Sequence, residues 1–125
     1  PTTIPTGLFR TSDGVVNIAG GGGEMWKRIV AVLGIEEEAK DPELATDTLR
    51  SQNRAKTNAV LQAKLETRTS AEWVSAFNEA GVPCGPVYAM NEVFADEQVK
   101  HLGLAMPVEH PQLGTVNLVR APMQI

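Results

Sequence analysis

Four consecutive glycines, Gly20–Gly23, separate two segments of different periodicity. Before them, the β-branched run Val15–Ile18 is typical of a strand, and the Asp13-Gly14 turn signal predicts that this run pairs with Phe9–Thr11 in a hairpin. After them, apolar residues recur with the i, i+3, i+4, i+7 spacing of an amphipathic helix that ends at Gly34. They occupy positions 26, 29, 30 and 33. The glycine run must therefore connect a strand to a helix.

The middle of the chain shows helix start and stop signals. Asp41 and Pro42 suit the N-cap and first position of a helix, and a second helix is predicted over Asn53–Glu66. A third starts at Thr69, three residues before Glu72 in a capping box, and ends at Gly81. Trp73, Val74 and Phe77 form its predicted core face.

The last third of the chain mixes short elements. Two prolines exclude a helix from Val82–Val87, which should be an extended crossing. Short helices are expected with Asn91 as a cap and over Glu97–Leu102, and strands over Leu104–Glu109 and Thr115–Val119. The predicted fold class is α+β: a small mixed sheet with several packed helices.

Composition limits the class of protein. The 125 residues are 42% hydrophobic and 21% charged, enough for the core of a single domain over residues 1–125. The net charge of −4 and the scattered Lys and Arg exclude a nucleic-acid partner, and no apolar run is long enough to cross a membrane. The single Cys84 fits a reducing, cytoplasmic location. Residues 1–7 are linker-like, and the chain is expected to be a fragment of a longer one.

The glycine run itself allows three interpretations. A strand, glycines and a helix start can hold a phosphate, but Glu24 and Met25 replace the Lys-Ser/Thr pair of a P-loop. A mobile flap over an active site uses the same conformational freedom of glycine. A plain connection with close backbone approach is the third interpretation. A flap is favoured, because a turn needs only one or two glycines.

Other chemistry-bearing residues suggest no complete site. Glu24 suits the first turn of a helix, where the dipole favours an acid. Cys84 has no neighbouring base and is expected to be an inert, buried thiol. His101 and His110 lack a cluster of further ligands, so no metal site is predicted. Three cations flank the glycine turn and could meet a phosphate, although a surface role is favoured: Arg10, Lys27 and Arg28.

The order of these segments resembles the family III coenzyme A transferases, which include formyl-CoA:oxalate CoA-transferase and α-methylacyl-CoA racemase. The resemblance begins with Asp13–Ala19, the glycine turn and Trp26–Arg28. It continues through Asp41-Pro42, Arg50, Asn53-Arg54 and the specific segment Ala80–Val87. It ends with Gln98-Val99, Leu102–Leu104 and Glu109–Pro111, so it covers nearly the whole chain.

This resemblance implies the small domain of an interlocked homodimer that moves coenzyme A between carboxylic acids. Acyl-CoA thioesters and acids would be substrates, with no permanently bound cofactor. The aspartate that forms the aspartyl-CoA intermediate would lie outside this chain, so no catalytic residue is assigned here. Gly20, Gly21, Gly22 and Gly23 match a gating loop over the active site. A racemase domain and a stand-alone binding module are the alternatives.

Overall fold

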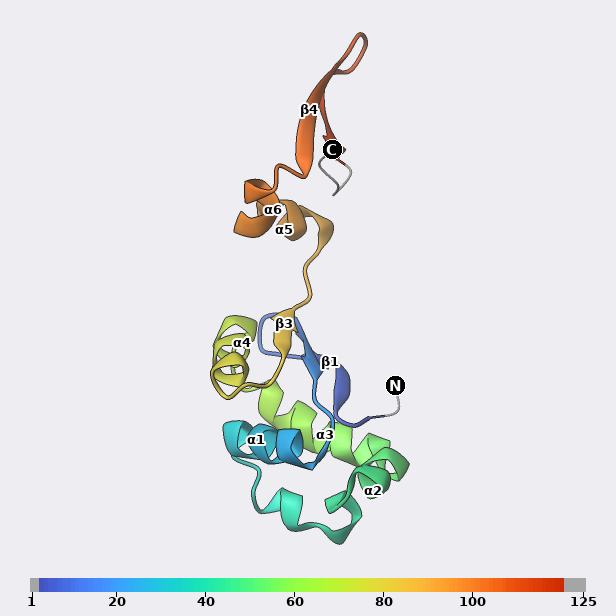
Figure 1. The fold of residues 1–125 in the computed structure, drawn as a ribbon, viewed down its shortest axis with the longest axis vertical. Coiled ribbons are helices and arrows are strands. Elements are labelled where there is room, and N and C mark those ends of the chain that lie inside the picture. The colour runs from blue at the N-terminus through green and yellow to red at the C-terminus, as the bar shows by residue number, and fades with distance from the viewer. Residues whose placement is uncertain (1–2, 121–125) are drawn as a thin grey trace. The chain divides into compact units, whose positions relative to one another are not determined.

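The computed structural model describes residues 3–120, which divide into two compact units (Figure 1). The first unit runs to Val87 and the second begins at Tyr88. Both units combine helices with small antiparallel sheets, which confirms the predicted α+β class.

A three-stranded antiparallel sheet organises the first unit. Its strands are β1 (Thr6–Arg10), β2 (Val15–Ala19) and β3 (Cys84–Pro86), in the order β1-β2-β3. The predicted hairpin is confirmed, with Phe9 opposite Val16. The strand β3 comes from the Pro-interrupted crossing, and it pairs Cys84 with Ile18. The sheet thus joins the segment before the glycine run to a segment more than sixty residues later.

The helices of the first unit lie between β2 and β3 in the sequence. The longer ones are α1 (Gly23–Leu33), α3 (Arg54–Leu65) and α4 (Ser70–Glu79). Gly34 ends α1 in the left-handed conformation, at φ 63°, and Thr69 caps α4 in the predicted capping box. Between α1 and α3 lie two 3₁₀ turns, η1 (Glu38–Lys40) and η2 (Pro42–Leu44), and the short helix α2 (Asp47–Gln52).

One hydrophobic core lies between the sheet and these helices. The sheet contributes Phe9, Val16 and Ile18, and the amphipathic face of α1 contributes its four predicted apolar residues. Trp73 and Phe77 of α4 lie in the same cluster with their rings 5.8 Å apart, and Val74 packs at its edge. Within the stretch 1–7, expected to be linker-like, Ile4 is buried and Thr6 opens β1.

The second unit consists of two short helices and a two-stranded hairpin. The helices are α5 (Met90–Ala95) and α6 (Glu97–His101). The strands β4 (Ala105–His110) and β5 (Gly114–Val119) pair in antiparallel order, close to the predicted ranges. Among residues 3–120, no helix is both long enough and apolar enough to cross a membrane.

The predicted cap of α5 was wrong. Ala89 is the N-cap residue, with extended backbone, and Asn91 lies inside the helix. The Glu92 carboxylate accepts a hydrogen bond of 2.6 Å from the Ala89 backbone N–H, which starts the helix earlier than the Asn91 signal indicated. Only the hydrogen bond from the Ala89 N–H to Glu92 is formed, because an alanine side chain cannot accept the second hydrogen bond of a capping box.

Candidate functional site at the glycine run

The four glycines do not form one uniform loop. Gly20 follows the end of β2, Gly22 is the N-cap of α1 and Gly23 is already the first residue of that helix. Only Gly20–Gly22 therefore connect the two elements. The surroundings of each glycine show how closely it is packed.

Gly20 is anchored in the protein. It is buried, its backbone N–H donates a 3.0 Å hydrogen bond to the Pro5 carbonyl, and its carbonyl accepts one of 3.3 Å from the Thr6 hydroxyl. A Cβ at this position would overlap the Ile29 side-chain terminus and lie 3.2 Å from the Pro5 carbonyl oxygen. Glycine is needed here for close packing between the start of the chain and α1, not for mobility.

The next three glycines are progressively freer. A Cβ on Gly21 would lie 2.8 Å from the Thr3 Cβ, a contact with one exposed residue. Gly22 has φ 86° and ψ 156°, a conformation that favours glycine, and its surroundings would leave room for a Cβ. Gly23 is exposed and also has open space where its Cβ would be. The surroundings of the four glycines therefore differ: Gly20 is tightly packed, Gly21 meets only Thr3, and Gly22 and Gly23 border open space.

The start of α1 is acidic rather than phosphate-binding. Gly22 provides no side-chain cap, and Glu24 occupies the first turn, as expected from the helix dipole. Glu24 and Lys27 form an exposed ion pair of 3.4 Å on the same helix. This carboxylate beside the free N–H groups disfavours a phosphate at this helix start.

The three cations near the glycine run do not gather at it. Arg10 pairs with Glu66 at 3.4 Å on the surface. Lys27 pairs with Glu24, and the Arg28 guanidinium lies against the turn at Gly81, 2.7 Å from where a Cβ would be. Surface and packing roles therefore account for the cations, as the sequence favoured.

A buried arginine supports the helix that the glycines precede. Arg50 of α2 is only 1% exposed, and its guanidinium carbon lies 4.6 Å from the centre of the Trp26 ring of α1. It donates a 2.7 Å hydrogen bond to the Leu44 carbonyl and pairs with Asp47. The stacked cation and ring therefore connect the first turn of α1 to the η2–α2 segment.

Sequence reasoning assigned no packing role to this residue. Arg50 appeared only as part of the resemblance. The helix start predicted at Asp41 and Pro42 corresponds to the 3₁₀ turn η2, and a separate helix α2 capped by Thr46 was not predicted. The i, i+3 spacing of Asp47 and Arg50 was the available signal, but it is also common on exposed helix faces.

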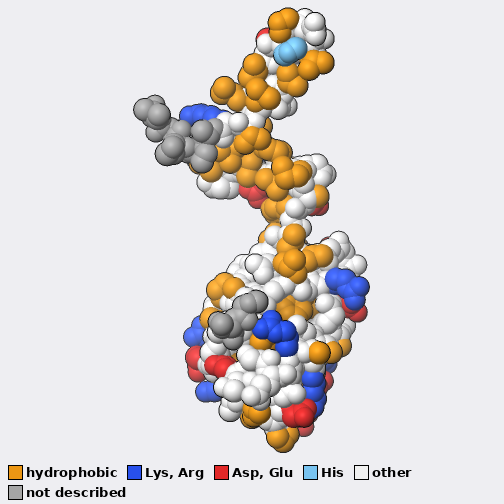
Figure 2. All heavy atoms as spheres, turned by 90° about the vertical axis from the view of Figure 1, so that its right-hand side faces the viewer, with side chains coloured by type: hydrophobic (Ala, Val, Ile, Leu, Met, Phe, Trp, Pro, Cys, Tyr) orange, Lys and Arg blue, Asp and Glu red, His pale blue; other side chains and the backbone are white. Residues whose placement is uncertain are grey.

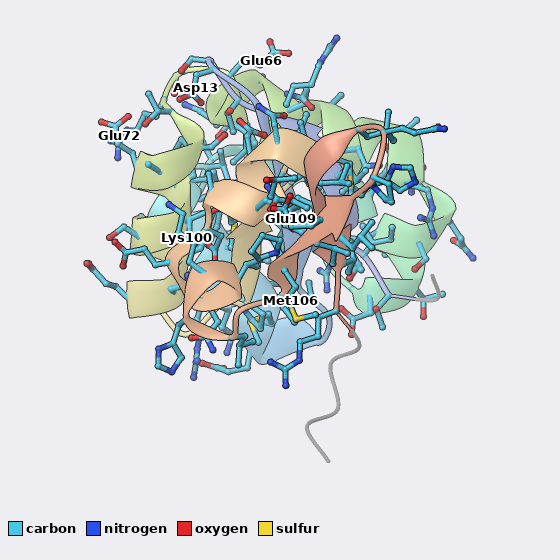
Figure 3. The ribbon with its side chains drawn as sticks, turned by 90° about the horizontal axis from the view of Figure 1, so that it is seen from above. Asp13, Glu66, Glu72, Lys100, Met106 and Glu109 are labelled. Atoms are coloured by element: carbon cyan, nitrogen blue, oxygen red, sulfur yellow. The ribbon has the colours of Figure 1, made fainter. Side chains whose placement is uncertain are left out.

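A polar network connects the β1–β2 turn to α4. The Asp13 carboxylate accepts hydrogen bonds from the Ser70 backbone N–H, at 2.7 Å, and from the Thr11 hydroxyl, at 3.1 Å. The Ser70 hydrogen bond is the main cause that lowers the pKa of Asp13. Figure 3 shows Asp13 beside Glu72, whose pKa is lowered mainly by the backbone N–H of Thr69. The network serves to hold a turn on a helix start.

The remaining candidates lie outside this arrangement. Cys84 is half-buried, and burial raises the pKa of its thiol to about 11, which agrees with the predicted inert thiol. His110 is exposed, and its Nδ1 accepts two backbone hydrogen bonds of 3.2 Å within its own turn. His101 is exposed at the end of α6. Among residues 3–120, no three His, Cys, Asp or Glu side chains gather as a metal ion would require.

Comparison with known proteins identifies the family. The model of "CoA-transferase family III" matches residues 1–125. The chain belongs to CoA-transferase family III. A curated relative is the mouse succinyl-CoA:glutarate CoA-transferase, 31% identical over 92% of this chain and 26% of the relative. A formyl-CoA:oxalate CoA-transferase from a Bradyrhizobium species is 28% identical over 81% of the chain and 24% of its own length.

A solved structure of another protein has the same fold as this family III chain. It is a CAIB/BAIF family protein from Brucella suis, with a TM-score of 0.80 and 28% identity. The match covers 98% of this chain and 35% of that protein. The chain thus spans about a quarter of the curated relatives it matches and about a third of the solved one.

Proposed function

We propose that this family III chain is the small domain of an enzyme that transfers coenzyme A between carboxylic acids. The observation that carries the proposal is the family match over all 125 residues, together with relatives that are named CoA-transferases and are about four times longer. These relatives favour neither a racemase nor a stand-alone binding module. The parent is proposed to be a cytoplasmic, interlocked homodimer without a resident cofactor.

The proposed reaction runs through an aspartate outside this chain. Its carboxylate attacks the thioester carbonyl of an acyl-CoA, which forms a mixed anhydride and releases CoA thiolate. The thiolate attacks the aspartyl carbonyl, releases the donor acid and leaves aspartyl-CoA. An acceptor carboxylate then attacks that thioester, and the thiolate attacks the acceptor's carbonyl in the new anhydride. The acyl-CoA product leaves and the aspartate is restored.

Each of these intermediates is open to attack by water. Water attack on either anhydride or on the aspartyl thioester would release free coenzyme A without forming the acyl-CoA product, so a cover over the site has a clear chemical purpose. We assign this cover to the glycine run, with Gly20 as the anchor and Gly21–Gly23 as the moving part. The buried contacts of Gly20 and the open space at Gly22 and Gly23 support this division.

The experiment compares two alanine variants of the intact parent. Gly22→Ala strains a positive φ, whereas Gly23→Ala meets no neighbour and stiffens the helix start by up to about 1 kcal/mol. Both are expected to increase the share of acyl-enzyme that is lost to water, measured as free CoA formed per acyl-CoA product. A Gly85→Ala variant, at a site with open space on β3, is the matched control.

The gating role of the glycines and the transferase activity of the parent are tested by separate outcomes. If the Gly22→Ala and Gly23→Ala parents lose no more acyl-enzyme to water than the Gly85→Ala parent, the glycines do not act as a gate. If the unaltered parent transfers no coenzyme A from any acyl-CoA to any carboxylic acid, the transferase proposal itself is wrong. The isolated chain of 125 residues is expected to show no turnover, because the proposed nucleophile lies outside it.

A further inference from the structure

The described residues 88–120 of the second unit have no hydrophobic core of their own. None of the described residues 88–120 is buried, whereas all the buried hydrophobic residues belong to the first unit. Hydrophobic side chains gather over residues 88–120 in Figure 2. Seven large ones are exposed: Tyr88, Met90, Leu102, Met106, Leu113, Leu118 and Val119. A two-stranded hairpin with two short helices is at best marginally stable in water, so this surface needs a partner.

The hairpin has one apolar face. Side chains alternate across a strand, and Met106 lies opposite Leu118 while Val108 lies opposite Val116. These four residues are the apolar face of the hairpin. The other face is mixed: Ala105, Pro107 and Val119 lie on it beside polar groups, including a 2.6 Å hydrogen bond from the Thr115 hydroxyl to Glu109. The side chains of Met106 and Glu109, both labelled in Figure 3, extend from opposite faces of β4.

A hollow lies beside the base of this hairpin. Its volume is about 220 Å³, and it is lined by Phe94, Ala105, Asn117, Leu118 and Val119. A cavity of about 150 Å³ lined by apolar side chains can hold a benzene molecule. The hollow therefore has room for one or two apolar side chains from a covering segment. Leu118 of the apolar face lines it, whereas Ala105, Asn117 and Val119 belong to the other face.

The size of the face indicates what kind of partner can cover it. Met106 and Leu118 are about half exposed, and the four side chains together offer on the order of 300 Å² against the roughly 800 Å² per partner of a stable complex. A second copy held by this face alone would bind weakly. A segment of the same polypeptide binds at an effective concentration in the millimolar range, and a small face is then sufficient.

We propose that the apolar face of the hairpin docks a part of the same polypeptide that lies outside these 125 residues. This inference rests on the proposed function, in which the chain acts within a longer family III polypeptide. The relatives offer the required length, since this chain matches only about a quarter of each. The docked segment supplies the hydrophobic contacts that residues 88–120 do not make among themselves.

The test is amide hydrogen exchange of β4 and β5 in two proteins: the polypeptide purified from its source cells and the chain of 125 residues. Exchange should be at least roughly thirtyfold slower in the former, because opening of the hairpin must then break the docked contacts. Met106→Ser with Leu118→Ser should remove that difference. Leu113→Ser is the matched control, because Leu113 is 71% exposed and lies in the turn between β4 and β5.

Retained protection of β1 and β2 checks that the double variant still folds, and the single variant Met106→Gln repeats the test with a smaller change. The inference is overturned if the source polypeptide is no longer than 125 residues or if the hairpin exchanges equally in both proteins. It is also overturned if the short chain forms a dimer that the double variant abolishes. Coenzyme A transfer is assayed on the same samples. Transfer without protection of the hairpin refutes only the docking inference, and protection without transfer refutes only the proposed transferase activity.

Discussion

Replacement of Arg50 should destabilise the first unit far more than replacement of an exposed arginine with the same kind of partner. Arg50 is 1% exposed and stacks on Trp26 at 4.6 Å. Arg68 stacks on Trp73 at 5.0 Å but is exposed. The two positions thus differ mainly in burial, which makes Arg68→Ala the control for Arg50→Ala.

The magnitude follows from the contacts of Arg50. Arg50→Ala leaves the buried Leu44 carbonyl without its 2.7 Å donor, which costs about 1–3 kcal/mol. The desolvated stacking on Trp26 contributes about 2 kcal/mol more. The Arg50 Nε is buried without a partner, so its removal returns about 1 kcal/mol. The net loss is about 3 kcal/mol, whereas Arg68→Ala should cost about 0.5–1 kcal/mol.

Urea unfolding followed by tryptophan fluorescence measures both variants, because Trp26 and Trp73 are the two tryptophans of the chain. Arg50→Lys separates charge from shape: it keeps the cation but loses the planar stacking and the forked donors, so a loss of about 2 kcal/mol is expected. A loss below about 1 kcal/mol for Arg50→Ala, or equal losses at Arg50 and Arg68, would refute the reasoning from burial.

Three further predictions concern the first unit. Gly20→Ala should cost about 1–3 kcal/mol in urea unfolding because its Cβ would overlap Ile29, whereas Gly23→Ala should be neutral or slightly stabilising. Cys84 should react with iodoacetamide at pH 8 roughly a hundredfold more slowly than a free cysteine, because its pKa of about 11 is two units above the ordinary 9.0. The lowered pKa of Asp13 contributes stability above its ordinary pKa of 3.8 that is lost as the pH falls through the folded value. Asp13→Asn should therefore flatten the fall in urea midpoint between pH 5 and pH 2, and an unchanged slope would contradict this.

Local patterns in the sequence predicted most of the elements. The stripe at positions 26, 29, 30 and 33, the Thr69 capping box and the Asp13-Gly14 hairpin were confirmed. Each of these signals lies within a few residues of the structure that it specifies, so a single sequence is enough to read them. Asn91 was the exception, because the Glu92 carboxylate accepts a hydrogen bond from the Ala89 N–H and the helix starts two residues earlier.

The sequence by itself determined that a glycine run joins a strand to a helix, and it predicted no complete nucleophile-and-base pair in this chain. Only the tertiary structure separated Gly20 from Gly21–Gly23, because the contacts that hold Gly20 come from Pro5 and Ile29. It alone buried Arg50 against Trp26, twenty-four positions earlier in the chain. Local propensity is a property of neighbours in sequence, whereas burial and steric contact depend on residues that only folding brings together.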